Sequence, residues 1–315
     1  MCKKYHLASL FIAVIISIIV PLTAMAADYP TRDITLVVPW SPGGATDTLA
    51  RLLATDVQKN VSKSVIVLNK AGGNGAIGHT YGALARKDGY TATLMTTESS
   101  IMHLMGTAKF SYKDFTPVAL IATAPAVIAV VSDSPYKTYK DFVNAVKKNP
   151  DKIKIAALSE GSIWNLALKL IAKESGVKFT AIPFDGGNPA IAAALGKHAD
   201  AVSCGYSEIL PFVQDGRMRI LGITSAKRQI TYDKAPTFKE QGIPVEIGAW
   251  WGIGLPQNTP SEIVNKVADL FGKAIKSSES QKFIKDRGFE GNYLDRQQFA
   301  DWLNKMDGVF KKAVQ

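Results

Sequence analysis

The feature that most constrains this chain is a short apolar segment that runs through a glycine turn directly into a helical pattern. Ile34–Val38 is apolar, residues 39–44 are rich in proline and glycine, and Thr46–Asn60 has its leucines at helical spacing. Glycine lets backbone N–H groups approach a ligand closely, and a helix start adds unpaired N–H donors and a positive dipole end. The segment therefore predicts a strand, a turn and a helix that together bind a small anion such as a carboxylate.

Similar units recur along the chain, because apolar strand-like segments alternate with amphipathic helical ones. This order predicts an α/β fold with mainly parallel sheets, arranged as two similar halves. We expect a leader over residues 1–26, the first part of domain 1 over 27–128, domain 2 over 129–248, and a return to domain 1 over 249–315. Ligands bind at the carboxyl ends of parallel strands, so two facing halves predict a cleft that closes by hinge motion.

Local signals place several helix starts and turns. Asn188 is predicted as the N-cap of a helix with Pro189 at its first position, and Thr259 as the start of another with Pro260 first. Residues 96–100 are predicted as a polar loop after a strand. The adjacent tryptophans Trp250 and Trp251 lie on a predicted strand and should point to opposite faces of it.

The first residues predict export. Lys3 and Lys4 precede an almost wholly apolar run over 7–22, and Ala24-Met25-Ala26 is an A-x-A cleavage signal. We expect cleavage after Ala26 and a periplasmic mature chain. The alternative is an uncleaved membrane anchor, which the run disfavours because it is shorter than the ~20 residues that a spanning helix needs.

Composition excludes some partners. The formal net charge is +10, and loss of the two leader lysines lowers it to +8. A basic surface steers anions, but the lysines are dispersed, without the basic stripe and stacking aromatics typical of nucleic-acid binding. Cys204 would be the one cysteine of the mature chain, so no intramolecular disulfide is expected and a buried thiol is favoured. We expect a monomer that binds no nucleic acid.

Enzyme and cofactor alternatives have weaker support. Gly73, Gly75 and Gly78 match a dinucleotide-binding fingerprint, and Glu98 follows at the expected spacing of 20 residues. Export argues against this hypothesis, because dinucleotide cofactors are scarce outside the cytoplasm. Residues 205–209 lack the second glycine of a hydrolase nucleophile elbow, and the histidines lack metal-ligand spacing. Asp47 fits a catalytic acid or a helix-capping residue equally. We therefore expect no cofactor, no metal and no enzymatic activity.

Several separated motifs occur in one order over nearly the whole mature chain, and in that order they resemble the Bug-family extracytoplasmic solute receptors of tripartite tricarboxylate transporters. The motifs lie at residues 38–47, 69–78, 87–91, 114–119, 183–187 and 250–260. The resemblance implies a two-domain periplasmic-binding-protein fold that closes like a flytrap. It implies a small ligand, usually with a carboxylate, held between the first glycine turn and a second-domain loop.

Carried over to this sequence, the resemblance predicts a cleft formed by the turn at 41–47, the second-domain loop at 159–162 and four further loops. The predicted ligand-binding residues are Trp40, Ser41, Gly44, Ala45, Thr46, Asp47, Asn74, Gly75, Thr97, Glu98, Ser99, Ser159, Glu160, Gly161, Ser162, Trp164, Phe184, Asp185 and Tyr206.

The sequence departs from the family pattern around the second-domain loop. Glu160 replaces a small residue, Trp164 stands where histidine is common, and Asp185 stands where a basic or neutral residue is common. With Glu98, these acids would place negative charge around the cleft and disfavour a polyanion, unless they point to solvent.

The predicted function is therefore a periplasmic receptor for a small carboxylate-containing metabolite, which is a monocarboxylate, an amino acid or a dicarboxylate. The receptor would deliver this ligand to a tripartite tricarboxylate-type membrane transporter. The alternatives are an exported enzyme such as a hydrolase, and a ligand sensor for a signalling partner.

Overall fold

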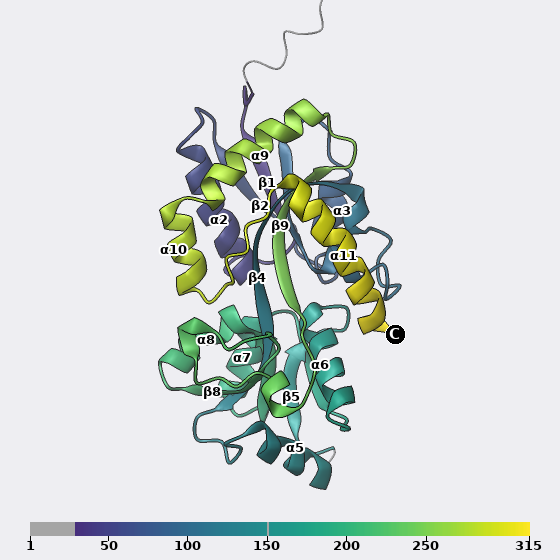
Figure 1. Ribbon diagram of the computed structural model, residues 1–315, viewed down its shortest axis with the longest axis vertical. Helices are drawn as coiled ribbons and strands as arrows, with labels where there is room; N and C mark the ends of the chain where they lie inside the picture. The colour runs from purple at the N-terminus through teal and green to yellow at the C-terminus, as the bar shows by residue number, and fades with distance from the viewer. Residues whose placement is uncertain (1–28, 150) are drawn as a thin grey trace, which may run out of the picture.

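The computed structural model describes residues 29–149 and 151–315. The predicted leader and the cleavage site at Ala26 lie outside the described residues. Within those two ranges, no helix combines the length and the apolar character needed to cross a bilayer. The described chain forms two lobes stacked along the long axis of the molecule (Figure 1).

Strands and helices alternate along the chain as predicted. The strands are β1 (Ile34–Val38), β2 (Val65–Asn69), β3 (Thr91–Thr96), β4 (Phe115–Val131), β5 (Lys154–Leu158), β6 (Thr180–Phe184), β7 (Ala201–Gly205), β8 (Met218–Ile223) and β9 (Gly248–Pro256). The α-helices are α2 (Ala45–Gln58), α3 (Ala76–Ala83), α4 (Glu98–Ile101), α5 (Tyr139–Lys148), α6 (Ile163–Glu174), α7 (Gly187–Leu195), α8 (Tyr206–Gln214), α9 (Ser261–Ile275), α10 (Ser278–Asp286) and α11 (Arg296–Val314).

Each lobe contains a triplet of parallel strands. The first lobe orders them β2-β1-β3 and the second β6-β5-β7, and helices α2, α3, α9, α10 and α11 surround the first triplet (Figure 1). The expectation of mainly parallel sheets is wrong at the centre of the molecule, where β4, β8 and β9 all pair antiparallel. The reason is that β4 runs from the first lobe to the second while β9 runs back.

Strand β4 is the main connection between the lobes. It pairs with β9 from Phe115–Pro256 to Pro125–Gly248, and from Ala126 onward it pairs with β7 and β8. Pro117 and Pro125 lie inside β4, although a proline inside a strand pattern normally marks an edge or an end. The domain boundaries at residues 128 and 248 stay predictions.

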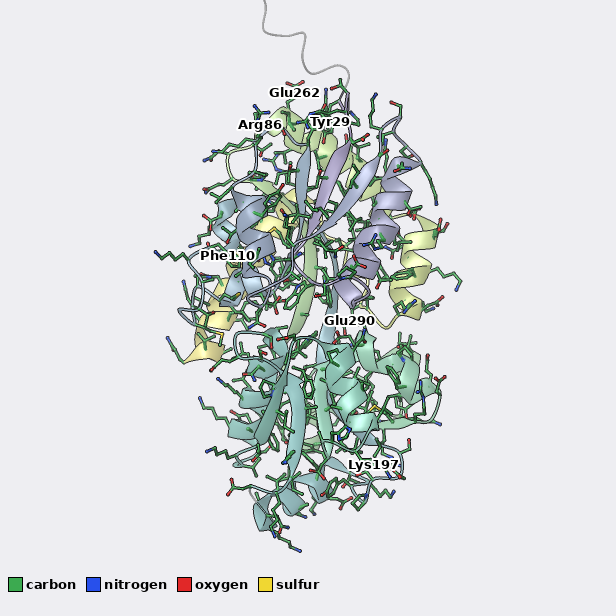
Figure 2. All side chains as sticks on the ribbon, turned by 180° about the vertical axis from the view of Figure 1, so that it is seen from behind. Tyr29, Arg86, Phe110, Lys197, Glu262 and Glu290 are labelled. Atoms are coloured by element: carbon green, nitrogen blue, oxygen red, sulfur yellow. The ribbon has the colours of Figure 1, made fainter. Side chains whose placement is uncertain are left out.

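The lobe connection is reinforced by Glu290, which lies between the lobes in Figure 2. Its Oε2 accepts a hydrogen bond from Thr123 Oγ1 at 2.9 Å, and its Oε1 accepts one from Gln229 Nε2 at 2.7 Å. Gln229 belongs to the second lobe. The carboxylate of Glu290 therefore connects β4 with the second lobe beside the hinge.

Two predicted helix starts are wrong. Helix α7 begins at Gly187 with Gly186 as N-cap, so Pro189 is the third helical residue. Proline is tolerated there because first-turn N–H groups have no intrahelical partner. Helix α9 begins at Ser261, one residue later than predicted, because the Thr259 hydroxyl donates to Pro256 O at 2.7 Å and caps no helical N–H.

The tryptophan pair on β9 lies as predicted, with the two rings on opposite faces and both buried, at 1% and 3% exposure. Trp250 packs edge-on against Phe299, and Trp251 packs edge-on against Phe289. Cys204 is a fully buried free thiol in β7, which confirms that prediction.

Candidate functional site

A cavity of about 310 Å³ lies between the lobes, where the carboxyl ends of β1, β3, β5 and β6 meet the starts of α2, α6 and α7. A larger hollow of about 1060 Å³ lies beside the hinge and is lined by residues such as Thr123 and Trp250, but it includes none of the predicted ligand-binding residues. The smaller cavity is therefore the candidate site. Among the predicted site residues, those that line it are Trp40, Ser41, Gly44, Ala45, Thr46, Glu98, Trp164 and Asp185.

The turn before α2 presents open backbone at the cavity. Gly43 has φ of +84°, a conformation that favours glycine, whereas Gly44 is extended with φ of −78° and caps α2. A Cβ atom at Gly44 would meet only Ser41 O, at 3.8 Å. The N–H groups of Ala45 and Thr46 are in the first helical turn and have no intrahelical acceptor. These donors are consistent with the anion site predicted from the turn.

Asp47 serves the turn and does not line the cavity. Its carboxylate accepts hydrogen bonds from Gly43 N at 2.8 Å, Arg51 Nε at 2.9 Å and Asn69 Nδ2 at 2.9 Å. Burial alone would raise the pKa of this carboxyl, but these donors outweigh it and hold the pKa below its ordinary value. Of the two roles left open by the sequence, the geometry favours the structural one.

Glu98 begins α4, where the sequence predicted a loop, and it is only 4% exposed. Its Oε2 accepts from Thr96 Oγ1 at 2.5 Å, and its Oε1 accepts from Ile163 N, at the start of α6 in the other lobe, at 3.2 Å. Burial raises the pKa of Glu98 despite these bonds. The carboxylate therefore connects the two lobes across the cavity wall.

Glu208 is the most informative residue that sequence reasoning missed. It is the third residue of α8, and its Oε2 accepts from Gly205 N at 3.0 Å. A Cβ atom at Gly187 would lie 2.4 Å from this carboxylate, so the start of α7 fits closely against it. Burial, aided by the negative charge of Glu98, raises the pKa of Glu208 to about 7. The sequence signal that could have identified Glu208 was its position just after strand β7, at the edge of the sheet where the strands have their carboxyl ends.

The other missed residues fall into two groups. Some neighbour the predicted ones, and the rest lie on strand ends or on β9, where sequence gives no local sign of a cleft. They are Pro42, Thr96, Leu158, Ile163, Gly186, Gly187, Asn188, Pro189, Ala249 and Trp251. Trp251 donates from Nε1 to Thr46 Oγ1 at 2.9 Å, which fixes the indole against the start of α2.

Many predicted site residues lie outside the cavity lining. They are Asp47, Asn74, Gly75, Thr97, Ser99, Ser159, Glu160, Gly161, Ser162, Phe184 and Tyr206.

Several of these have structural partners instead. Thr97 Oγ1 accepts from Trp250 N at 2.7 Å, Ser162 Oγ caps α6 by accepting from Asn165 N at 3.2 Å, and the buried Tyr206 bonds Thr231.

Glu160 and Asn74 form a contact between the lobes beside the cavity. Asn74 Nδ2 donates to the backbone oxygen of Glu160 at 2.5 Å. The side chain of Glu160 is 71% exposed and pairs with Lys169 at 2.5 Å. Of the open alternatives for this acid, the geometry favours the solvent-facing one.

The glycines that mimic a dinucleotide fingerprint pack against protein. A Cβ atom at Gly78 would lie 2.5 Å from Pro39 Cα and 2.7 Å from Lys70 O. This glycine is needed so that α3 can approach β1 and the turn that follows it. None of the three glycines lines the candidate cavity. The described residues also contain no group of three or more His, Cys, Asp or Glu side chains arranged to hold a metal ion.

Two α/β lobes joined by crossing strands, with a cavity between them, define a periplasmic-binding-protein type of solute receptor. Comparison with solved structures agrees. BugD, a periplasmic binding protein, is 29% identical, with 90% of this chain and 97% of that chain covered and a TM-score of 0.83. MatC from Rhodopseudomonas palustris with bound malate is 26% identical, with 91% and 100% covered and a TM-score of 0.83. An R. palustris protein with adipate is 28% identical, with 91% and 97% covered and a TM-score of 0.84.

The family model for the tripartite tricarboxylate transporter family receptor matches residues 49–312. The chain belongs to this receptor family, as its motifs indicated. It is a solute-binding receptor and not an enzyme, and the two-lobed fold expected from the resemblance is confirmed.

Proposed function

We propose that this receptor captures a small carboxylate-containing solute in the cavity between its lobes and delivers it to a tripartite tricarboxylate-type membrane transporter. The observation that carries the proposal is the start of α2, where Gly44, Ala45 and Thr46 line the cavity, the backbone at Gly44 is open, and the first-turn N–H groups have no intrahelical acceptor. Unpaired donors at a helix start favour an anion. The malate and adipate in two of the similar solved structures are such anions.

The volume and the lobe contacts support the same function. About 310 Å³ is at the small end of the range for ligand pockets and suits a small metabolite. Glu98 and Asn74 each join the lobes beside the cavity. Opening about β4 and β9 would break both contacts and release the solute, which is the hinge motion a receptor needs to hand its ligand to a transporter.

The proposal includes export with cleavage after Ala26 and function as a monomer in the periplasm. The supporting observation is the A-x-A signal after the apolar run of the leader. N-terminal sequencing of the secreted protein should begin at Ala27, and light scattering should give the mass of one chain. A mature protein that starts at Met1, or that pellets with membranes, would contradict the export hypothesis.

The carboxylate site is tested by Gly44→Val. The φ of Gly44 is negative and a Cβ there meets only Ser41 O, so the variant should fold while its branched side chain blocks the backbone donors. We expect at least about tenfold weaker binding, equivalent to about 1.4 kcal/mol, by calorimetry with a panel of monocarboxylates, dicarboxylates and amino acids. Gly308→Val on the exposed surface of α11 is the matched control. Equal affinities of both variants would place the carboxylate elsewhere, and a wild-type protein that binds no carboxylate would refute the function.

A further inference from the structure

The cavity differs in charge from the rest of the chain. Its lining includes the acids Glu98, Asp185 and Glu208 but no lysine, arginine or histidine, although the whole chain has a formal net charge of +10. A carboxylate ligand therefore meets only uncharged hydrogen-bond donors within this lining. A second carboxylate on the same ligand would bring further negative charge beside three acidic side chains, and this repulsion is costly.

Two of the acids are placed to receive a cation. Glu98 is contributed by the first lobe and Glu208 by the second, both line the same cavity, and the negative charge of Glu98 helps to raise the pKa of Glu208. The Oε1 atom of Glu208 has no hydrogen-bond partner among the residues that the structure describes. A carboxylate has about four acceptor positions, so both side chains retain capacity for further donors.

We propose that this cavity selects a solute with both a carboxylate and an ammonium group, and rejects the dicarboxylate of equal length. The carboxylate lies at the start of α2 and the ammonium group between Glu98 and Glu208. This inference rests on the proposed function, because one end of the ligand would bind the proposed anion site and the other end the two acids. An ammonium group supplies three donors and one positive charge, which satisfies the open acceptor and offsets the paired negative charges.

The close fit around Glu208 supports a binding role for it. The Gly187 position leaves room for its carboxylate only because glycine has no Cβ, and Gly205 N fixes one oxygen. The carboxylate is thus held in place before a ligand arrives, which lowers the entropic cost of binding. Asp185 is exposed at the rim of the cavity and adds to the negative field there.

The test is calorimetry with matched probe pairs that differ in one functional group, at the chain end or, for lactate and alanine, on the α-carbon. The pairs are succinate with 4-aminobutanoate, glutarate with 5-aminopentanoate, adipate with 6-aminohexanoate, and lactate with alanine. Wild type is compared with Glu208→Gln, which removes the charge and keeps the shape. Glu160→Gln is the matched control, because Glu160 is exposed, pairs with Lys169 and lies outside the cavity lining.

We expect the amino member of at least one pair to bind wild type about tenfold or more tightly than its partner, since a hydrogen bond between charged groups is worth ~1.5–3 kcal/mol. Glu208→Gln should abolish or reverse this preference, and Glu160→Gln should retain it. Tighter binding of the dicarboxylates or of lactate by wild type, or an unchanged preference in Glu208→Gln, would overturn the inference and leave the receptor function standing. If no probe of either kind binds, the carboxylate-binding function and the inference fail together.

Discussion

The two lobes each place an acid at the same position of a helix that follows a strand end, and the two acids differ sharply. Asp47 is the third residue of α2, whose N-cap is Gly44, and Glu208 is the third residue of α8, whose N-cap is Gly205. Asp47 accepts hydrogen bonds from three donors and has a lowered pKa. Glu208 accepts from one donor, and its pKa is raised to about 7.

The difference teaches that the local pattern does not decide whether an acid is structural or available to a ligand. Arg51 and Asn69 surround Asp47 with donors, so its charge stabilises the turn that precedes α2 beside the candidate cavity. Glu208 is near Gly187, Trp164 and the negative charge of Glu98, and it forms no salt bridge with the residues that the structure describes. An uncompensated acid in a cavity is costly to the fold and is the better candidate for binding.

The largest effect that separates the two acids should be on stability. Asp47→Asn removes the charge that pairs with Arg51 and sets an amide against donors from Gly43 and Asn69. We expect a loss of about 2 kcal/mol in the free energy of unfolding, with the exposed Arg51 contributing only part of it. Glu208→Gln should change the same quantity by less than about 0.5 kcal/mol or increase it at pH 8. Urea unfolding of both variants measures these free energies of unfolding. Equal losses in the two variants would mean that Asp47 and Glu208 do not differ in their structural role.

The next effect is a pH dependence of binding. Because the folded pKa of Glu208 is about 7 against an ordinary 4.5, the folded chain holds the proton more tightly than the unfolded chain. The contribution of this group to stability without ligand therefore falls as pH rises from about 4.5 to 7 and then levels off. An ammonium ligand needs the ionised form, so its affinity should rise about tenfold from pH 6 to pH 8, as the ionised fraction does.

If the pH dependence of binding is lost in Glu208→Gln, it arises from the ionisation of Glu208. Any pH dependence that remains in this variant arises from Glu98, whose pKa is also raised. Calorimetry across this range with the tightest amino-carboxylate probe provides the measurement. A flat profile in wild type would mean that Glu208 is ionised throughout or does not meet the ligand. Either result would mean that Glu208 resembles Asp47, either in being ionised throughout this range or in not contacting the ligand.

The smallest effect concerns the lobe contact outside the cavity. Asn74 has φ of +51°, so Asn74→Gly keeps the backbone relaxed while it removes the hydrogen bond to Glu160 O. We expect binding weaker by about 0.5–1 kcal/mol, since one exposed hydrogen bond contributes to closure, and little change in unfolding. A loss as large as that of Gly44→Val would show that closure, more than the acids or the α2 turn, governs affinity.

Most of the alternation of strands and helices was predictable, because the periods of apolar residues are local properties of the sequence. The full length of the central strand β4 was not predictable from the sequence. Pro117 and Pro125 interrupt its strand pattern, and its pairing with β9 joins residues more than 120 positions apart. The α2 side of the candidate site was predictable from its glycine turn. On the second-lobe side, the predicted residues Trp164 and Asp185 line the cavity and Glu160 does not, whereas Glu208 and the start of α7 line it without having been predicted.

The sequence by itself determined the family, the α/β class and the strand, glycine turn and helix on the α2 side of the candidate cavity, because each of these depends on short contiguous patterns such as residues 38–47. Only the tertiary structure decided which acids face the cavity. Asp47, Glu160 and Glu208 all follow strand ends, and their local surroundings in the sequence look alike. Their roles depend on groups brought from other elements, namely Asn69 beside Asp47, Lys169 beside Glu160, and Gly187 with Glu98 beside Glu208. The ionisation of a carboxyl group is set by the donors and charges a few ångströms away, whatever their separation along the chain.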